Sequence, residues 1–258
     1  MPVHPTAIID PQARVAESAD IGPYCIIAAD VEIAPETRLI ANVFVEGPTW
    51  IGENNVFYPY STVGVAPQDL KYKGERSETR IGNRNRIREF VTIHRGTEGG
   101  GVVTRIGDDN LLMAYVHVAH DVQVASHVVL SNGATLGGHV LVEDWAVVGA
   151  FSGVHQFCRV GRHAIVGGYS VITQDVLPFS TTVSERANKV FGANRTGLER
   201  RGLRAELIED LQKALRLLTR SGLNTSQAIQ RIRGEIASSP ELEDLLSFIA
   251  ASQRGFVK

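Results

Sequence analysis

An aliphatic residue recurs at every sixth position of this sequence between residues 106 and 172. The positions are Ile106, Leu112, Val118, Val124, Leu130, Leu136, Val142, Val148, Val154, Val160, Val166 and Ile172. Small or slim residues such as Ala134, Ala146 and Ser152 stand four positions after them. A period of six fits neither an α-helix nor a simple alternating strand, and it is typical of a parallel β-helix built from hexapeptide turns. Three hexads close one triangular coil, so residues eighteen apart become vertical neighbours about 4.8 Å apart.

The repeat keeps the same phase back to the N-terminus. In-phase residues run from Val3 to Val63, and the next one is Ile81. The gap from Val63 to Ile81 is eighteen residues, which equals one whole coil. The sequence inside this gap is polar and has no hexad residues at the expected places. We therefore predict a loop at about residues 65–80 that projects from one side of a coil.

A second interruption follows Ile93. The step from Ile93 to Ile106 is thirteen residues, seven more than one hexad, and the excess is rich in glycine. We predict a second loop insertion at about residues 97–104. Long loops in an otherwise economical repeat are usually functional.

The repeat stops after Ile172, and Pro178 marks the exit from the coil. The sequence predicts a mainly β fold. A left-handed parallel β-helix over residues 1–178 is followed by a connection over residues 179–194 and a C-terminal α-helical domain over residues 195–258.

Apolar residues in the C-terminal domain recur with helical spacing in three segments, at residues 203–222, from near Thr225, and after Pro240. Those expected to point inward are Leu207, Leu211, Leu215, Leu218, Ala228, Ile229, Ile232, Ile236, Leu242, Leu245, Leu246 and Ile249. A domain of roughly 65 residues buries too little surface to stand alone. We expect it to pack on the prism or on a neighbouring subunit.

The composition is that of an ordinary soluble protein, with 43% hydrophobic residues and a net charge of −2. Nothing indicates a basic nucleic-acid stripe or a membrane-surface helix. No apolar run approaches the roughly 20 residues of a membrane span, and no signal peptide is apparent, so we expect a cytoplasmic protein without stable membrane insertion. Cys25 and Cys158 occupy slim inward positions, which predicts buried thiols.

The eighteen-residue register gathers several histidines at one edge of the prism. Once the seven inserted residues are removed, His94 lies in a column with Ala119, Gly137 and His155, and His120 lies below Gly138 and Gln156. Asp121 lies below His139. The predicted cluster spans on the order of 15 Å and contains His94, His120, His139, His155, Asp121 and Gln156. The isolated histidines His4, His127 and His163 are interpreted as solvated.

Such a cluster suits acyl transfer. A histidine side chain is able to accept a proton at cell pH and to act as a general base. With Gly138 one coil above His120, its N–H is placed to face the oxyanion of a carbonyl attacked by an alcohol that His120 deprotonates. Asp121 would orient the His120 ring, although neighbouring residues of a strand point to opposite faces, which argues against this role.

The same histidines permit a metal site. Three imidazoles would bind zinc with one open position. The spacing argues against it, because His117 and His120 are three apart on an extended coil, whereas a metal takes ligands from facing chains. We expect no bound metal, and metal analysis of the purified protein would decide.

Eight segments together resemble the bacterial acyl-carrier-protein:UDP-N-acetylglucosamine O-acyltransferases, which open the lipid A pathway. The likeness spans the prism, the first loop and the helical domain, nearly the whole chain. The segments are QDLKYKGE at 68–75, IGNRNRIRE at 81–89, TIHRGT at 92–97, DNLLM at 109–113, HVAHD at 117–121, GGHV at 137–140, VHQFCRVG at 154–161 and ERRG at 199–202. The hexad repeat alone is shared by other acetyltransferases, so the first loop with HVAHD and VHQF carries the specificity.

The resemblance implies a homotrimer with active sites between adjacent prisms. His120 would be the general base that takes the proton of the glucosamine 3-hydroxyl as it attacks the thioester of an (R)-3-hydroxyacyl carrier protein, and Gly138 would supply the oxyanion N–H. No cofactor is implied beyond the 4′-phosphopantetheine of the donor. The residues implied or proposed to bind substrate are Gln68, Asp69, Lys71, His94, His117, His139, His155, Gln156, Asn194, Arg200 and Arg201.

Acyl length is predicted at about fourteen carbons, because long-chain members have glycine where Gly168 stands and a bulkier residue would shorten the pocket. Two departures bear on this prediction and on base recognition. The segment VSERANKVFG at 183–192 is one residue longer than in relatives, and Thr196 replaces a frequent acidic residue. The acidic carrier implies a basic docking patch, whose candidates are Arg159, Arg162, Arg200, Arg201 and Arg204.

Alternatives remain open at this point. A sibling N-acyltransferase of the same pathway shares the prism, but it carries an extra N-terminal domain for which a repeat starting at Val3 leaves no room. A non-catalytic scaffold would lack activity. Whether the acceptor bears a 3-hydroxyl or a 3-amino group is left undecided, since both suit a base at His120.

Overall fold

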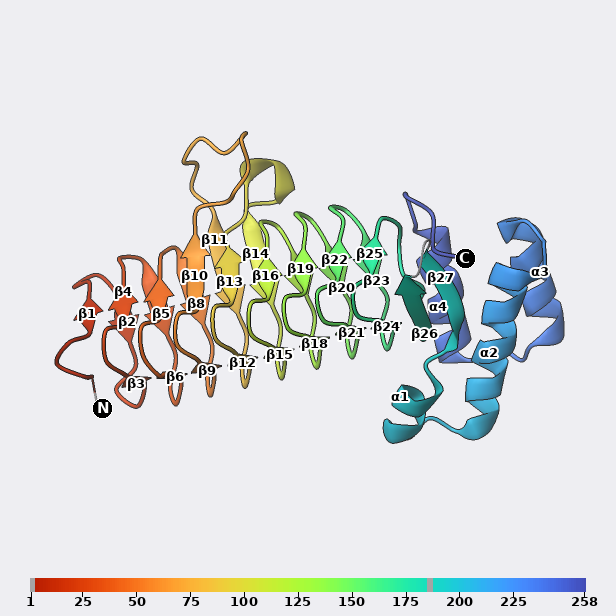
Figure 1. Ribbon diagram of the computed structural model, residues 1–258, viewed down its shortest axis with the longest axis horizontal. Helices are drawn as coiled ribbons and strands as arrows, with labels where there is room; N and C mark the ends of the chain where they lie inside the picture. Colours follow the sequence, from red (N-terminus) through yellow and green to blue (C-terminus); the bar gives the residue numbers. More distant parts are fainter. Residues whose placement is uncertain (1–2, 185–187) are drawn as a thin grey trace.

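The strands form a three-sided prism, the left-handed parallel β-helix that the hexads predict (Figure 1). The computed structural model describes residues 3–184 and 188–258. The chain visits three sheets in turn, which we call faces 1, 2 and 3. Corner A joins faces 1 and 2, corner B joins faces 2 and 3, and corner C joins faces 3 and 1.

Face 1 contains nine parallel strands, which are β1 (Ile8–Ile9), β4 (Ile26–Ile27), β7 (Phe44–Val45), β10 (Thr62–Val65), β13 (Thr92–His94), β16 (His117–Val118), β19 (Thr135–Leu136), β22 (Gly153–Val154) and β25 (Val171–Ile172). Face 2 contains eight, which are β2 (Arg14–Val15), β5 (Val31–Ile33), β8 (Thr49–Ile51), β11 (Glu78–Ile81), β14 (Val103–Ile106), β17 (Gln123–Val124), β20 (Leu141–Val142) and β23 (Arg159–Val160). Face 3 contains ten, which are β3 (Asp20–Ile21), β6 (Arg38–Leu39), β9 (Val56–Phe57), β12 (Arg86–Ile87), β15 (Leu111–Leu112), β18 (Val129–Leu130), β21 (Val147–Val148), β24 (Ile165–Val166), β26 (Ser180–Ser184) and β27 (Asn188–Ala193).

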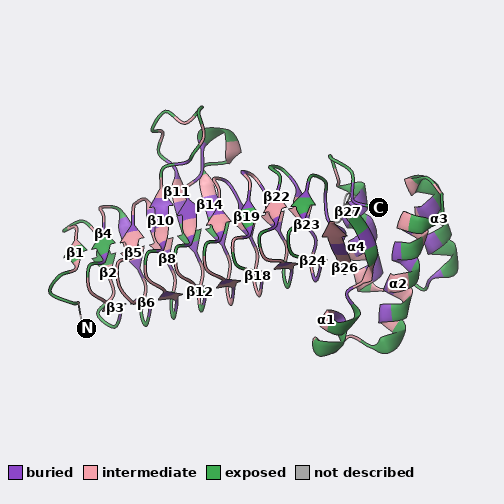
Figure 2. Ribbon diagram, viewed as in Figure 1, coloured by how far each residue is buried: buried purple, intermediate pink, exposed green. Residues whose placement is uncertain are grey.

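The hexad residues fill the prism interior. All twelve from Ile106 to Ile172 have a relative exposure of 3% or less, and burial alternates along the strands (Figure 2). This packing removes the aliphatic column from water, which is the main stabilising term for such a coil. Cys25 and Cys158 are buried free thiols, as predicted. Burial raises the pKa of the Cys158 thiol to about 11, which suppresses its reactivity.

The register confirms the second insertion and corrects the first. Ile81 pairs with Ile106, an offset of twenty-five, which is one coil plus the seven predicted residues. Ile51 pairs with Ile81, an offset of thirty, so twelve residues are inserted there. The prediction that the gap from Val63 to Ile81 is one whole coil was therefore wrong. The gap is one hexad step plus a twelve-residue loop, because the insertion is itself a multiple of six and leaves the phase unchanged.

Both insertions leave the prism at corner A (Figure 1). The first runs between β10 and β11, over residues 66–77, and the second runs between β13 and β14, over residues 95–102. The second contains a short 3₁₀ turn, η1 (Glu98–Gly100). The first insertion is thus shorter than the sequence predicts, and the second lies slightly earlier in the chain than predicted.

Most corner turns place one residue in the left-handed region of backbone conformation. Many of these residues are not glycine, among them Asp121 with φ of 61° and His139 with φ of 63°. A residue in this conformation costs roughly 1–2 kcal/mol relative to an ordinary one. The side chain of a residue in this turn therefore does not follow the inward and outward alternation of a strand.

Residues 179–194 were predicted as a connection, and they hold an antiparallel hairpin instead. β26 continues face 3, with Ile165 opposite Thr181, and then pairs with β27. The offset from β24 to β26 is sixteen residues rather than eighteen, so the six-residue count misses this strand. The centre of the longer segment at 183–192 lies outside the described residues.

Four helices follow, which are α1 (Arg195–Arg200), α2 (Ala205–Arg220), α3 (Thr225–Glu235) and α4 (Pro240–Ala250). The last three were predicted, whereas α1 was not, because six residues show no helical period. Asn224 and Gln227 form a capping box on α3, and Ser239 caps α4. Among the residues expected inward, Leu207 and Ile229 are only half-buried.

A second hydrophobic core joins the helices to the end of the prism. Leu177 and Phe179 pack there against residues from all four helices. Polar contacts also join the prism to the helices. Arg159 donates to Asp175 over 2.9 Å and to the Phe248 carbonyl of α4 over 2.6 Å. Among residues 3–184 and 188–258, no helix has both the length and the apolar character needed to cross a membrane.

Candidate active site

His120 and Gly138 lie on successive coils at corner A, as the register predicts. A Cβ atom built on Gly138 would come within 2.5 Å of His120 Cε1 and 2.7 Å of Nε2, so any side chain there would displace the ring. The neighbouring amides are occupied, because Gly137 donates to Val154 and His139 donates to His120. Within the described part of the chain, the Gly138 N–H donates to no acceptor. The imidazole therefore packs against a residue whose backbone N–H is available as a donor.

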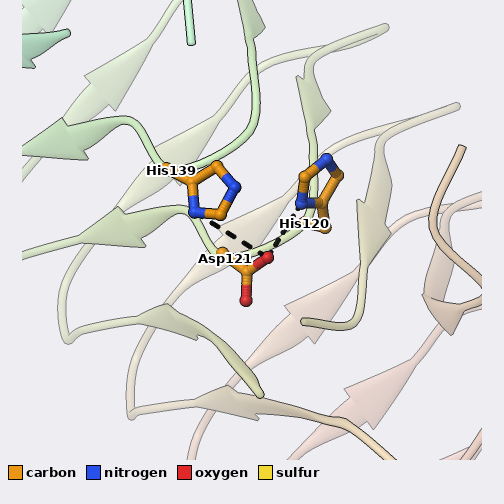
Figure 3. A group of neighbouring side chains, drawn as sticks. All are labelled: His120, Asp121 and His139. Carbon is orange, nitrogen blue, oxygen red and sulfur yellow. Dashed lines mark hydrogen bonds and ion pairs between the residues drawn. The ribbon is translucent and has the colours of Figure 1, made fainter. Parts of the chain in front are cut away.

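Asp121 hydrogen-bonds to the His120 ring. Its Oδ2 lies 2.8 Å from His120 Nδ1 and 3.9 Å from His139 Nδ1 (Figure 3). Strand alternation predicted opposite faces for Asp121 and His120, and that expectation was wrong. Asp121 occupies the left-handed corner position, which turns its side chain toward its neighbour. The carboxylate has no exposed side-chain surface and the His120 ring is 14% exposed.

Burial keeps the surrounding imidazoles neutral. It lowers the pKa of His94 to about 4, with smaller contributions from His117 and His120. It also lowers the pKa of His117, whose Nδ1 lies 2.7 Å from Thr92 Oγ1. The pKa of His139 is lowered by burial as well. The rings of His94 and His117 meet edge to face at 4.8 Å, and those of His120 and His139 at 5.1 Å.

A cavity of about 450 Å³ opens between this cluster and the first insertion. It is lined by Gln68, Asp69, Leu70, Lys71, His120, His139, Gln156 and Phe157. His155 does not line it. That residue is exposed, and its Nδ1 lies 3.2 Å from the carbonyl of Gln156. The cavity thus combines a base, a cation and a carboxylate from two parts of the chain far apart in sequence.

Asn194 and Arg201 lie at corner B, on a different edge of the prism. Asn194 is 3% exposed, caps α1 and donates to the His163 carbonyl. Arg201 covers the ring of Trp145 at 5.1 Å and donates to its carbonyl. Arg200 is exposed nearby on α1.

The three isolated histidines differ in their surroundings. His4 is exposed, and His127 stacks on Trp145 with a centroid distance of 3.9 Å. The interpretation of His163 as solvated was wrong, because it is 6% exposed and lies between the rings of Trp145 and Phe179. The hexad pattern could not show this burial, since it depends on the hairpin that covers the last coil.

The remaining residues are placed as follows. Gly168 lies exposed at corner C, where an added Cβ would come within 3.2 Å of the Ala150 carbonyl oxygen. Thr196 is exposed on α1. Of the arginines considered for carrier docking, Arg159 is held by Asp175, and Arg162 lies 3.5 Å from Asp244.

Two family models match the chain. The hexapeptide repeat of bacterial transferases (six repeats) matches residues 104–138, and UDP N-acetylglucosamine O-acyltransferase, domain 2, matches residues 175–257. A relative from Thermodesulfovibrio yellowstonii, named acyl-[acyl-carrier-protein]–UDP-N-acetylglucosamine O-acyltransferase, is 47% identical over 256 residues, which are 99% of each chain. The chain belongs to this acyltransferase family.

Solved structures agree with that assignment. LpxA from Acinetobacter baumannii is 42% identical, with a TM-score of 0.96 over 99% of each chain. LpxA from Bacteroides fragilis, described as a UDP-N-acetylglucosamine acyltransferase, is 37% identical, with a TM-score of 0.97 over 99% of this chain and 100% of that one. The resemblance drawn from the sequence motifs is therefore confirmed at the level of the family, and the chain is an acyltransferase.

Three side chains of this acyltransferase could hold a cation. Ligand atoms of His120, Asp121 and His139 all lie within 4.8 Å of one another. The Asp121 carboxylate is already engaged, since it accepts two hydrogen bonds from Thr97 in addition to its contact with His120. A metal would have to compete with these donors for the same oxygens.

The free energy of unfolding of this acyltransferase is expected to decrease as the pH is lowered below 6.5. Burial lowers the pKa of both His94 and His163 to about 4, whereas the unfolded chain titrates near 6.5. Between these values the unfolded state binds more protons, so the free energy of unfolding is fully present above about 6.5 and decreases toward pH 4, by on the order of 2–3 kcal/mol per histidine.

Denaturant unfolding at fixed protein concentration between pH 7.5 and 4.5 measures this slope. His163→Phe removes one titrating ring while keeping an aromatic between Trp145 and Phe179, and it should flatten the pH dependence. An equal slope in this variant and the parent would contradict the prediction.

Proposed function

We propose that this acyltransferase moves an (R)-3-hydroxyacyl chain from acyl carrier protein to the 3-hydroxyl of UDP-N-acetylglucosamine, the first step of lipid A synthesis. The stacking of His120 against Gly138 is the observation that carries the proposal. It brings a candidate base next to a backbone N–H that is free to bind the oxyanion of a reacting carbonyl. The names of the full-length relatives support the choice of donor and acceptor.

In this proposal His120 is the general base. Its Nε2 takes the proton of the sugar 3-hydroxyl as that oxygen attacks the thioester carbonyl, and Asp121 holds Nδ1. The tetrahedral oxyanion accepts the Gly138 N–H. When the intermediate collapses, the carbon–sulfur bond breaks, an ester forms, and the leaving thiolate of the 4′-phosphopantetheine arm takes the proton from His120. Apart from the 4′-phosphopantetheine of the donor, these bond and proton changes require no cofactor.

The cavity at corner A supplies the groups that would bind the substrates. Gln68, Asp69, Lys71 and Gln156 line it together with His139. We assign the Lys71 ammonium to a phosphate and the carboxylate and amides to sugar or acyl hydroxyls, since these are the partners that each group can satisfy. His94 and His117, neutral in their buried setting, lie near His120 and contact each other edge to face.

We further propose that the enzyme works as a homotrimer. The residues implied to bind the two substrates of one reaction lie at three different corners, with His120 at corner A, Asn194 and Arg201 at corner B, and Gly168 at corner C. A single prism keeps these corners apart, whereas adjacent copies bring different corners to one groove. Exposed aromatic side chains along corner C are consistent with association, and they are Tyr24, Tyr60, Phe90, Tyr115, Phe151 and Tyr169.

Mass spectrometry of reactions with UDP-N-acetylglucosamine and carrier proteins bearing (R)-3-hydroxyacyl chains of different lengths tests the activity. An acylated sugar nucleotide with the ester at the 3-position is expected. A parallel reaction with the 3-amino analogue of the sugar determines which acceptor is preferred. The absence of product with every donor would contradict the proposal.

The length of the preferred chain tests the role of Gly168. We expect about fourteen carbons for the parent. Gly168→Met should lower the ratio of activity on fourteen-carbon to ten-carbon donors by about 100-fold, because a filled pocket excludes methylenes. The Cβ contact of 3.2 Å with Ala150 allows the side chain with a small shift. Gly234→Met on α3, where a Cβ meets no neighbour, is the control, and an unchanged length profile for Gly168→Met would refute the role.

A further inference from the structure

The second insertion folds back onto Asp121. The Thr97 amide donates to Asp121 Oδ1 over 2.9 Å, and the Thr97 hydroxyl donates to Asp121 Oδ2 over 2.6 Å. Thr97 is 6% exposed and Asp121 is 3% exposed. Both carboxylate oxygens are therefore engaged by one residue of a loop that the prism itself does not require.

Two further contacts close the position around this carboxylate. The Asp121 amide donates to Thr104 Oγ1 over 2.8 Å, which fixes the backbone at the base of the side chain. A Cβ on Gly100 would lie 2.0 Å from Asp121 Cγ, so the 3₁₀ turn η1 passes directly over the carboxylate. Asp121 is thus held from its backbone, from both oxygens and from above.

This arrangement dictates where the proton on the His120 ring lies. The carboxylate can only accept, and the Thr97 amide and hydroxyl use one lone pair on each oxygen. The remaining contact of Oδ2 is His120 Nδ1 at 2.8 Å, so Nδ1 carries the hydrogen. His139 Nδ1 is 3.9 Å away, too far to compete. A neutral ring with Nδ1 protonated leaves Nε2 free on the side that faces Gly138.

We propose that the insertion at residues 95–102 is a positioning element, in which Thr97 acts through Asp121 to keep His120 with Nδ1–H and a free Nε2. Its effect on catalysis rests on the proposed function of His120, whereas its effect on the tautomer does not. Thr97 is absent from the lining of the cavity beside His120, although it lines the adjoining one, and its side chain bonds to Asp121 rather than to the proposed reacting atoms, so it is a positioning residue. The carboxylate alone would be free to rotate, and the loop removes that freedom.

Two threonine variants separate the hydroxyl from the rest of the loop. Thr97→Val keeps the amide donor and the shape but removes the hydroxyl, and Thr97→Ser restores it. We expect Thr97→Val to lower kcat about 10- to 100-fold, a fraction of the 10²–10⁴ that a general base contributes, with KM for the sugar nucleotide within about twofold. Thr97→Ser should recover to within about threefold. Thr219→Val on α2, which removes another hydroxyl bonded to a carbonyl, should change neither constant.

Two neighbouring glycines give a second, steric test. Gly100→Ala drives a methyl group into the Asp121 carboxylate, so it should reproduce the loss of kcat. Gly99→Ala, one residue earlier in the same turn, meets nothing within 4 Å and should leave kcat unchanged. Equal losses in both variants would show that the loop acts by some route other than Asp121, and would overturn the proposal.

The tautomer is measured directly by ¹⁵N NMR of the histidine rings at pH 9, with the His120 signals assigned by comparison with His120→Gln. Protonated Nδ1 is expected in the parent, and a mixture of tautomers in Thr97→Val and Gly100→Ala. A parent ring protonated at Nε2, or an unchanged tautomer with full kcat in Thr97→Val, would refute the proposal. If the parent shows no acyl transfer, the proposed function fails while the NMR comparison still decides the positioning role.

Discussion

Replacing His120 by alanine should lower kcat/KM by about 10³-fold, within the 10²–10⁴ that a positioned general base supplies. The loss arises because, among the described residues that line the cavity, His120 is the one imidazole that packs against Gly138. His139 is the nearest imidazole, but its ring stacks on Phe157 at 4.3 Å and is turned edge to face against His120. It is therefore not positioned to replace the missing base.

The measurement is steady-state acyl transfer, with size-exclusion chromatography and circular dichroism to verify assembly and fold. His4→Ala is the matched control, because that side chain is exposed and, among the described residues, bonds to Thr6 within its own turn. Activity of His120→Ala within tenfold of the parent would remove the base from the mechanism. A loss of assembly in the same variant would instead assign His120 a structural role.

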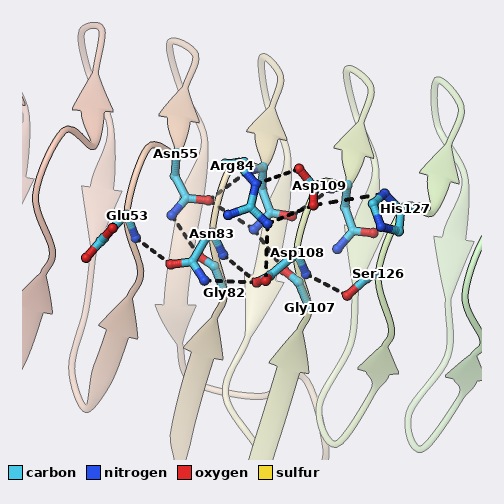
Figure 4. A network of polar contacts seen from close by, with 12 residues as sticks. Glu53, Asn55, Gly82, Asn83, Arg84, Gly107, Asp108, Asp109, Ser126 and His127 are labelled. Atoms are coloured by element: carbon cyan, nitrogen blue, oxygen red, sulfur yellow. Dashed lines mark hydrogen bonds and ion pairs between the residues drawn. The ribbon is translucent and has the colours of Figure 1, made fainter.

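The second large effect concerns a buried column of asparagines at corner B, which begins with the Asn55 labelled in Figure 4. Asn55, Asn85 and Asn110 are each 2% exposed or less and lie on successive coils. Asn85 Nδ2 donates to Asn55 Oδ1 and to the Gly107 carbonyl, and its Oδ1 accepts from the Asn110 amide, all at 2.9 Å. The Asn85 side chain thus bonds to the coils on both sides, whereas those of Asn55 and Asn110 bond to the coil that follows.

Asn85→Ala should lower the free energy of unfolding by about 3–5 kcal/mol. It leaves the Gly107 carbonyl and the Asn110 amide buried without this partner, and each such loss costs roughly 1–3 kcal/mol, whereas Asn55 Oδ1 keeps the Asn85 backbone amide as a donor. Guanidinium unfolding at fixed protein concentration measures the change. Asn132→Ala, an exposed corner position, is the control and should fall within about 0.5 kcal/mol. A midpoint for Asn85→Ala equal to that of the parent would show that the column adds no stability.

The sequence predicted those parts of the fold that depend on a strictly repeated contact. Each coil rests on the one before it, so the six-residue period alone placed Gly138 above His120. The insertion of seven residues was recovered because it broke the phase. The length of the first insertion was predicted wrongly, because its twelve residues are a multiple of six and leave the phase of the repeat unchanged.

The features that the sequence did not predict depend on local geometry or on packing outside the repeat. The Asp121–His120 contact arises from a left-handed corner residue, which strand alternation does not describe. The β26–β27 hairpin shifts by two residues from the coil spacing, and His163 is buried beneath it. Thr97 carries no sequence signal of its own, since its role appears only when the insertion is seen folded over Asp121.

Both insertions leave the prism at the same corner while the coils above and below continue in register. Lengthening such a loop costs little, since closure entropy rises by only about 0.6 kcal/mol for each doubling of its length. The β-helix therefore allows the insertions that border the pocket to change in length without repacking of its interior. Exchanging residues 66–77 for longer or shorter segments offers a direct route to altered acceptor choice in an enzyme that stays folded.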